Sequence, residues 1–293
     1  MLRVLNNRAH PAMPQANAIF WPELQPAQMP PHFNNFAQLL LAEGDSWFAW
    51  AYMGFDISPS ILNALTFNRS TATLCYAYSG HTSGDMAAMA VSAGFMQEFS
   101  ARRFQAVLLS GGGNDLFNAL AGGNILKPAG GADPNDPASY IDVAELDALK
   151  DYVTRNYQQI LAWRLRPISM NKTTPVLLHT YDYPMPRPAP AKVFGQPAVG
   201  PWLLPALRNV NAPAALHFDI IKEIASDMLD CIRAFDDPAA GIFVVDTCGT
   251  LTPSAPGSTG DDADWVNEIH PNAAGYAKLA AKIQPQLAAC GVS

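Results

Sequence analysis

The order of apolar segments constrains the fold of this 293-residue chain more than any other feature. Five short runs rich in strand-forming residues recur along it, and several lack the alternation of polar and apolar residues that a half-exposed strand shows. These runs are residues 37–43, 72–78, 105–110, 175–181 and 241–246. Continuous apolar runs of this length are typical of strands that are buried on both faces of a parallel sheet.

Helical patterns lie between these runs. Apolar residues recur at intervals of three or four in each pattern, as on one face of a helix. The expected helices are residues 84–101, 142–165, 214–235 and 273–289. Strands that alternate with helices predict a doubly wound, parallel α/β sheet whose crossovers are right-handed.

Length and composition predict one globular unit. A chain of this size can bury one large core, and its 49% apolar and 15% charged residues exclude a disordered chain. We expect residues 36–293 to form a single domain and residues 1–35, rich in proline and polar amides, to wrap its surface. Two long excursions, 118–140 and 184–205, are expected to be irregular. We interpret them as walls or a lid of a substrate pocket, with surface decoration as the alternative.

The charge of the chain bears on its partners. A net charge of −7 argues against nucleic acid or an anionic membrane as the main partner. No apolar stretch approaches the roughly 20 residues that span a bilayer, so no integral membrane segment is expected. The positively charged N-terminus has no apolar region behind it, which favours a cytoplasmic protein, with export as the alternative if a signal was removed before residue 1. The sequence predicts no oligomeric state.

Three motifs directly follow expected strands. They are Gly44-Asp45-Ser46, the segment 79–82 (Ser-Gly-His-Thr) and the segment 111–115 (Gly-Gly-Gly-Asn-Asp). Ligands of open α/β sheets bind beyond the carboxyl ends of the strands, so we expect the three motifs to converge at one edge of the sheet. A fourth motif, residues 267–271 (Asn-Glu-Ile-His-Pro), precedes the last expected helix.

The first motif supplies a candidate nucleophile. Acyl transfer needs a nucleophile with a base in reach and donors aimed at the developing oxyanion. Ser46 is our candidate, because Gly44 permits a sharp turn and the Asp45 side chain can hold that turn by accepting backbone N–H groups. The alternative is that Ser46 only caps a helix, as serine often does.

The second and third motifs supply candidate oxyanion donors. Gly80 has no Cβ, so its N–H can approach a reacting carbonyl, although a turn glycine is the simpler explanation. The side-chain amide of Asn114 can donate to the same oxygen, and Asp115 is expected to brace the loop. The glycines before Asn114 do not form a phosphate loop, because no Lys followed by Ser or Thr is present.

The fourth motif supplies a candidate base, His270, the one histidine in such a motif. The other five histidines are expected to be surface or structural residues, although His81 could also line a pocket because it follows Gly80. These five are His10, His32, His81, His179 and His217. The four cysteines and the acidic run 261–264 lack the spacing of a metal site, so no metal is expected.

Taken in order, Ser46, Gly80, Asn114 and His270 resemble the four conserved blocks of the SGNH (GDSL-type) hydrolases, and they span most of the chain. The resemblance implies a three-layer α/β/α fold with a five-stranded parallel sheet, similar to flavodoxin. It also implies hydrolysis of a carboxylic ester through an acyl-serine intermediate, with the oxyanion held by Ser46, Gly80 and Asn114. The substrate would be a small-molecule or lipid-derived ester, and no metal or organic cofactor would be needed.

The chain departs from this family at Asn267, where an aspartate usually stands three residues before the histidine. An amide oxygen can still accept the Nδ1–H bond of His270 and fix its tautomer, but it stabilises the imidazolium less than a carboxylate would. We predict that Asn267 orients His270. Asp264 is the rival, Glu268 is a third choice, and a backbone carbonyl stays open as a fourth.

Several residues near the motifs are candidates for substrate contacts. Trp47, Phe48 and Trp50 offer apolar area to an acyl or alkyl group, or they pack a helix into the core. Asp182 ends the fourth expected strand at the same edge and either faces the substrate or braces a loop. We keep Trp47, His81 and Asp182 as candidate substrate-binding residues.

Two other functions fit the sequence less well. An α/β-hydrolase is disfavoured because the sequence has no Gly-x-Ser-x-Gly motif. A carbohydrate- or lipid-binding module that has lost its catalytic activity is supported only by Asn267, and the retention of the other four residues argues against it.

Overall fold

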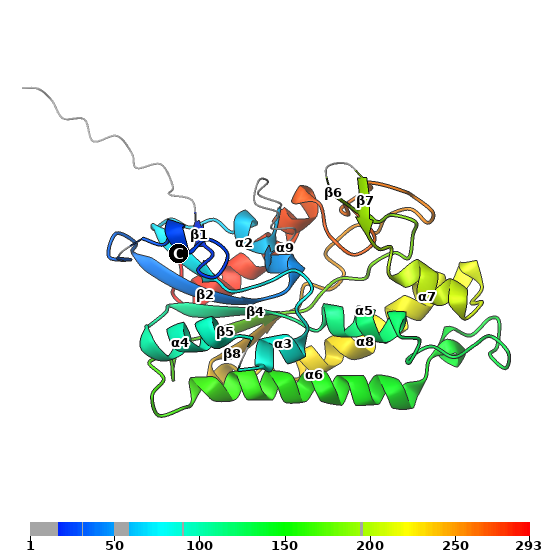
Figure 1. Cartoon of the computed structure of the whole chain (residues 1–293), viewed down its shortest axis with the longest axis horizontal. Helices are drawn as coiled ribbons and strands as arrows, with labels where there is room; N and C mark the ends of the chain where they lie inside the picture. The colour runs from blue at the N-terminus through cyan, green and yellow to red at the C-terminus, as the bar shows by residue number, and fades with distance from the viewer. Residues whose placement is uncertain (1–16, 31, 50–58, 90, 194–195) are drawn as a thin grey trace, which may run out of the picture.

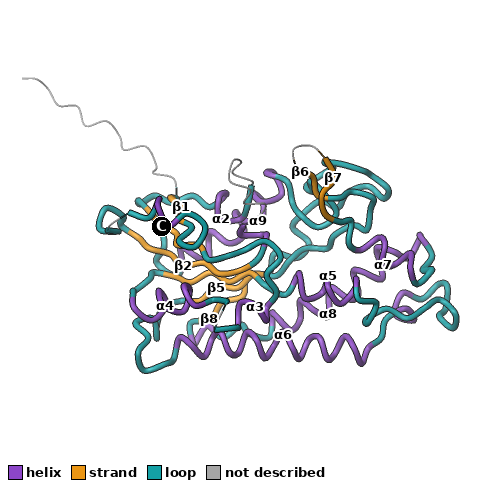
Figure 2. Tube along the Cα trace, viewed as in Figure 1, coloured by secondary structure: helices purple, strands orange, loops and turns teal. Residues whose placement is uncertain are grey.

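A parallel sheet of six strands forms the centre of the computed structural model, which describes residues 17–30, 32–49, 59–89, 91–193 and 196–293 (Figure 1, Figure 2). In spatial order the strands are β1 (Ala18–Phe20), β3 (Thr71–Cys75), β2 (Gln38–Gly44), β4 (Ala106–Ser110), β5 (Val176–His179) and β8 (Ile242–Val245). All neighbouring strands of this sheet pair in parallel. The doubly wound α/β fold expected from the sequence is therefore confirmed.

The sheet has one strand more than the expected five. The additional strand, β1, pairs with β3 from Ala18 opposite Ala72 to Phe20 opposite Leu74. It belongs to the segment that was expected to wrap the surface, so part of that segment extends the sheet instead. A strand of three residues is too short to show a periodic pattern, which is why the sequence did not reveal it.

Helices cover both faces of the sheet and complete three layers (Figure 1). One face carries α1 (Ser46–Ala49), α2 (Ile61–Ala64) and α9 (Ala273–Ala289). The other face carries α3 (Ser83–Ala87), α4 (Ala93–Ala101), α5 (Gly113–Ala121), α6 (Val143–Arg164) and α8 (His217–Arg233). A further helix, α7 (Leu203–Asn209), packs against α5 and α8. Short 3-10 turns occupy Pro26–Gln28, Pro137–Tyr140, Ala214–Leu216 and Pro238–Ala240.

Each face of the sheet has its own hydrophobic core. Alternate residues of a strand point to opposite faces, so Leu40 and Ala42 of β2 join the core under α9 while Leu41 joins the core under α6 and α8. Both cores exclude water from the strands, which explains why the strand sequences read as continuous apolar runs.

The expected helix 84–101 is instead two helices, α3 and α4. Thr82 begins α3 with a capping box, in which its side chain accepts from the backbone N–H of Asp85 and the Asp85 side chain accepts from the backbone N–H of Thr82. The helix ends at Ala88, which is extended, and the hydroxyl of Ser92 donates to the carbonyl oxygen of Asp85 at 3.2 Å. Serine competes in this way with the backbone hydrogen bonds of a helix, and the periodic apolar pattern did not reveal the break.

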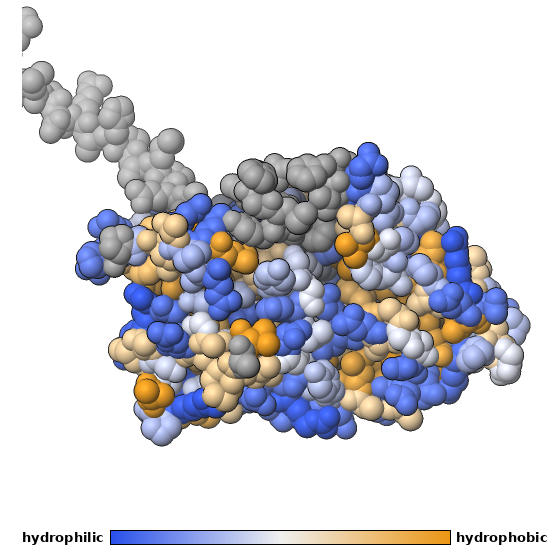
Figure 3. Space-filling view, viewed as in Figure 1, coloured by the Kyte–Doolittle hydropathy of each residue, from blue (hydrophilic) through white to orange (hydrophobic). Residues whose placement is uncertain are grey.

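The two excursions were expected to be irregular, but both contain regular elements. Residues 118–140 include the last turn of α5 and end in a 3-10 turn. Residues 184–205 include an antiparallel hairpin, β6 (Ala191–Val193) with β7 (Gln196–Val199), and the start of α7. On the face shown in Figure 3, apolar surface appears between this hairpin and α5.

The structure also shows the state of the cysteines and whether a helix could span a membrane. All four cysteines are free, and Cys75 is buried in the core. Within the described ranges, no helix has both the length and the apolar character needed to cross a bilayer.

Candidate active site

The turn after β2 places Ser46 at the carboxyl end of the sheet. From β2 the chain passes first to β3 on one side and then to β4 on the other, so β2 and β4 form the point where the strand order reverses. A Cβ on Gly44 would lie 2.5 Å from the carbonyl oxygen of Ser110 in β4, so only glycine permits the two strand ends to approach this closely. Ser46 then begins α1.

Asp45 ties this turn to two neighbouring strands. Its Oδ1 accepts hydrogen bonds from the backbone N–H of Trp47 and the hydroxyl of Ser110, both at 3.0 Å. Its Oδ2 accepts from the hydroxyl of Tyr181, which follows β5, at 2.5 Å. Burial raises the pKa of Asp45 to about 6, although these hydrogen bonds favour the ionised form. The residue before Ser46 therefore joins the ends of β2, β4 and β5.

The structure brings His270 to Ser46. The Nε2 atom of His270 lies 2.8 Å from the hydroxyl oxygen of Ser46, and its Nδ1 lies 3.0 Å from Oδ1 of Asn267. An amide oxygen can only accept, so Nδ1 carries the proton of the neutral ring and Nε2 accepts from the serine. This is the arrangement in which a serine can be activated by a base.

His270 is buried, with 2% of its surface exposed. Burial lowers the pKa of His270 to about 3, because the charged imidazolium would lose its hydration. The ring is therefore neutral at physiological pH and able to take a proton. The indole ring of Trp202, from the excursion 184–205, meets the imidazole edge-on with 5.9 Å between ring centroids.

The two rival acceptors for His270 have other partners. Asp264 accepts from the backbone N–H of Thr252 and from the ammonium group of Lys278 in α9, both at 2.6 Å. Burial opposes its ionisation, but these bonds hold the pKa of Asp264 below its usual value. Glu268 accepts from the backbone N–H groups of Leu203 and Leu204 at the start of α7, both at 2.8 Å. Of the three residues considered, Asn267 is the one whose oxygen lies at Nδ1.

Hydrogen bonds also join the second motif to the segment around Ser46, and the third motif to the second. The backbone N–H of Tyr78 donates to the carbonyl oxygen of Gly44 at 2.9 Å, and the hydroxyl of Ser79 donates to that of Ala49 at 2.5 Å. The side-chain amide of Asn114 donates to the carbonyl oxygen of His81 at 2.9 Å. The four motifs, far apart in the sequence, thus meet at one edge of the sheet.

Gly80 and the start of α5 depend on glycine for their backbone geometry. Gly80 has φ of +91°, and Gly112, the N-cap of α5, has φ of +105°, both in the region that favours glycine. Asn114 is the second residue of α5. Asp115 accepts from the backbone N–H and the hydroxyl of Ser83 at 2.7 and 2.9 Å, which is the bracing role expected for it.

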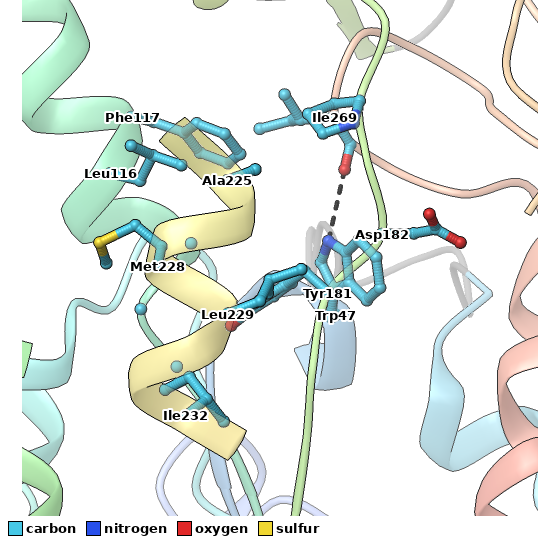
Figure 4. A pocket seen from close by; sticks show the side chains of 14 residues that line it. Trp47, Leu116, Phe117, Tyr181, Asp182, Ala225, Met228, Leu229, Ile232 and Ile269 are labelled. Carbon is cyan, nitrogen blue, oxygen red and sulfur yellow. Dashed lines mark hydrogen bonds between the residues drawn. The ribbon is translucent and has the colours of Figure 1, made fainter. Parts of the chain in front are cut away.

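The three candidate substrate residues lie in different surroundings. Trp47 is 4% exposed and packs edge-on against Tyr181, yet it also lines an apolar pocket beside the site (Figure 4). Asp182 lines the same pocket, while its carboxylate accepts from Gly249 and Leu251 and braces their loop. The His81 side chain is partly exposed and lies 3.9 Å from Glu43. Trp50 lies outside the described residues.

Sequence reasoning missed Arg187, which is fully buried beneath the histidine loop. Its guanidinium donates to the carbonyl oxygens of Asn267 at 2.7 Å, Gly260 at 2.5 Å and Trp265 at 3.3 Å, and to the hydroxyl of Ser258 at 3.1 Å. A single arginine within the proline-rich run 184–190 was the only signal. Nothing in the sequence connects it with residues about 80 positions away.

Comparisons with known proteins bear on the family and the fold of the chain. The family model described as GDSL-like Lipase/Acylhydrolase matches residues 50–283, beginning just after Ser46. The lipase Lip_vut3 from goat rumen metagenome is 15% identical, with a TM-score of 0.55 over 87% of this chain and 98% of that chain. An extracellular lipase from Streptomyces rimosus is 18% identical and covers 87% of this chain and 100% of its own, but its TM-score is 0.46.

No curated protein matches the chain. At such low identities a solved structure supports only the fold. Of the two lipases, the one from goat rumen metagenome supports it, because its TM-score exceeds 0.5. The family model is the stronger finding, because it covers most of the chain and because Ser46, His270 and Asn114 lie at the expected edge of the sheet. The chain therefore belongs to the GDSL-like lipase and acylhydrolase family, whose resemblance its four motifs had indicated.

Proposed function

We propose that this protein hydrolyses carboxylic esters through an acyl-serine intermediate on Ser46. The observation that carries the proposal is the continuous path from the Ser46 hydroxyl through both nitrogens of His270 to the Asn267 amide oxygen, at 2.8 and 3.0 Å. A serine that donates to a neutral imidazole, whose other nitrogen is held by a fixed acceptor, has the geometry of an activated nucleophile.

In the first half of the reaction, the Ser46 oxygen attacks the ester carbonyl carbon while Nε2 of His270 takes the hydroxyl proton. The tetrahedral intermediate then collapses: the bond to the alcohol oxygen breaks, and the imidazolium gives its proton to that oxygen. In the second half, water attacks the acyl carbon while His270 takes a proton from it. The bond from that carbon to the Ser46 oxygen then breaks, and the imidazolium returns its proton to this oxygen. The products are one carboxylic acid and one alcohol.

Three donors are proposed for the oxyanion. Ser46 is the first residue of α1, and the first N–H groups of a helix have no partner within the helix. The Asn114 amide has two hydrogens, of which one is directed to the His81 carbonyl oxygen and the second remains for the substrate. The N–H of Gly80 is the third donor. Such preorganised donors stabilise charge where it develops in the transition state.

The first test is Ser46→Ala, measured with p-nitrophenyl esters and a fluorophosphonate probe. We expect the variant to lose both turnover and labelling while it keeps its fold, because the nucleophilic oxygen is gone. Asn114→Ala should lower kcat by about 10²–10³. Ser100→Ala, a change near the end of α4 and just before β4, is the matched control and should keep native rates.

An unchanged rate in Ser46→Ala would remove Ser46 as the nucleophile. A native protein that neither labels nor turns over any ester, yet binds lipids or sugars, would support the catalytically inactive binding module instead. The fluorophosphonate probe separates these readings, because it reacts with an activated serine whatever the preferred substrate is.

A further inference from the structure

An apolar pocket lies beside the site, between helices α5 and α8 and the ends of β4 and β5 (Figure 4). Its empty volume is about 510 Å³, which includes space open to solvent. Helix α5 contributes Leu116 and Phe117 to one wall. The opposite wall is a stripe of α8 at helical spacing, formed by Ala225, Met228, Leu229 and Ile232.

Three lining residues are the immediate chain neighbours of the proposed machinery. Trp47 follows Ser46, Gly113 precedes Asn114, and Ile269 precedes His270. The indole N–H of Trp47 donates to the carbonyl oxygen of Ile269 at 3.3 Å, so the nucleophile turn and the histidine loop are joined at the pocket wall. The pocket therefore adjoins the place where an ester carbonyl would react.

The polar side chains of the lining are already engaged. The Tyr181 hydroxyl donates to Asp45, and the Asp182 carboxylate accepts from the Gly249 and Leu251 N–H groups. In Figure 4 this carboxylate points away from α5 and α8. A sugar would need free hydrogen-bonding groups to replace its hydration, whereas a hydrocarbon chain needs none.

We propose that this pocket binds the acyl chain of the substrate and makes the protein selective for esters of medium-length fatty acids. The inference rests on the proposed function and adds its substrate class. The α8 stripe, from Ala225 to Ile232, extends over about 10 Å at 1.5 Å per residue. An extended chain of about eight carbons has a similar length, with bonds of about 1.5 Å.

The pocket is assigned to the acyl side of the ester for two reasons. The leaving oxygen must face Nε2 of His270 to receive its proton, whereas the pocket extends along the Gly111–Gly113 turn before Asn114. The acyl group also stays bonded to Ser46 through both halves of the reaction, so a lined pocket holds it in place while the alcohol departs and water enters.

The first experiment measures kcat/KM of the native protein for p-nitrophenyl esters from acetate to octanoate. We expect kcat/KM to rise by up to about four-fold for each added methylene. A flat or falling profile in a protein that labels with fluorophosphonate would overturn the pocket while leaving the proposed function intact. Absence of both turnover and labelling would instead overturn the proposed function.

The second experiment fills the pocket with Ala225→Phe, which adds a ring to the buried face of α8. We expect the octanoate-to-acetate ratio of kcat/KM to fall by about ten-fold or more. Glu223→Phe places the same side chain on the exposed side of α8 and should keep the native ratio. Leu116→Trp fills the pocket from α5 and serves as the second variant if Ala225→Phe does not fold, as judged by circular dichroism.

The third experiment compares octyl acetate with an octanoate ester in the same variants. The acyl assignment predicts that Ala225→Phe lowers the rate on the octanoate relative to the rate on octyl acetate. A loss confined to octyl acetate would place the alcohol chain in the pocket and overturn the assignment. An unaltered ratio of octanoate to acetate in both folded pocket variants would overturn the proposal as a whole.

Discussion

Oδ1 of Asn267 lies 3.0 Å from Nδ1 of His270 and also accepts the backbone N–H groups of Ile269 at 3.0 Å and His270 at 2.9 Å. One neutral oxygen thus fixes both the imidazole and the backbone turn that carries it. The amide orients the ring as a carboxylate would, but it brings no charge to stabilise the imidazolium. Orientation and charge stabilisation, which an aspartate supplies together, are separated at this site.

Asn267→Asp should restore that charge. A carboxylate next to the ring raises the pKa of a histidine by about one to three units, so the acidic limb of the pH–rate profile should move to higher pH. Better stabilisation of the imidazolium should also raise kcat near pH 8 by about ten-fold. The measurement is kcat/KM between pH 4 and 9 (on the order of the range over which histidines titrate).

Asn267→Ala is the counterpart, because it leaves three N–H groups without their acceptor. It should lower kcat and reduce the free energy of unfolding by about 1–3 kcal/mol or more. If Asn267→Ala kept native kcat, or if the acidic limb of Asn267→Asp moved to lower pH, Asn267 would not be the residue that orients His270.

Because the carboxyl group of Glu43, in β2, is buried, we expect the free energy of unfolding to depend on pH in an unusual direction. It is 1% exposed, its Oε1 accepts the N–H of Gly44 at 3.0 Å, and burial raises its pKa from 4.5 to about 7. Between these two pH values the folded protein keeps a proton that the unfolded chain releases. The contribution of Glu43 to stability is therefore fully present below pH 4.5 and is lost as the pH rises through 7.

Glu43→Gln removes this titration while keeping an acceptor for Gly44. At pH 8 the variant should be more stable than the native protein, by up to about 3 kcal/mol from the difference between the two pKa values, and at pH 4 the gain should vanish. Thermal unfolding of both proteins at pH 8 and at pH 4 (about the two ends of this titration) measures this difference in stability. A gain of equal size at both would show that the Glu43 charge is not the cause.

Arg187→Met tests the support beneath the histidine loop. The substitution leaves one hydroxyl and three carbonyl oxygens without their donor, and buried groups left in this way cost about 1–3 kcal/mol each. We expect a large fall in Tm and a fall in kcat, since Asn267 is one of the partners.

The matched control is Arg233→Met in α8, whose guanidinium pairs with Asp230 and Asp246 near the surface. Exposed ion pairs contribute about 0–1 kcal/mol, so its Tm should change little. If Arg187→Met lowered Tm as little as Arg233→Met does, the hydrogen bonds of Arg187 to the loop would not matter for stability.

Gly44→Ala tests the close approach of β2 to β4. The added Cβ would lie 2.5 Å from the Ser110 carbonyl oxygen, so the strands must separate at the nucleophile turn. We expect a loss of about 1–3 kcal/mol in stability and a loss of esterase activity. Gly130→Ala is the control, because its Cβ would meet nothing within 4 Å and its φ is outside the left-handed region. Native activity in Gly44→Ala would contradict the tight turn.

The sheet could be predicted because its buried strands read as unbroken apolar runs, and the motifs could be placed together because parallel strands end at one edge. Short elements with few residues, such as β1 and the β6–β7 hairpin, carried no such pattern. The choice between Asn267 and Asp264 depends on the path of a loop. Isolated bridges from Trp265 to Asp262 and to Pro271 fold that loop, and Asp264 reaches α9 instead of His270.

Polar contacts between residues far apart in the sequence could not be predicted either. Arg187 acts on carbonyl groups, and every residue has a carbonyl, so no residue type in the histidine loop marks the contact. Glu268 stood next to the expected orienter in the sequence, yet the loop bends at these residues and the two side chains point to different partners. Its carboxylate therefore binds the start of α7.

The segment around Ala189 and the histidine loop hold each other in place. The backbone N–H of Glu268 donates to the carbonyl oxygen of Ala189 at 3.0 Å, and the backbone N–H of Arg187 donates to the Glu268 carboxylate at 3.2 Å. A chimaera that transplants residues 267–271 into another scaffold would lose these hydrogen bonds to the segment around Ala189. Recombination between relatives should therefore exchange the two stretches as a pair.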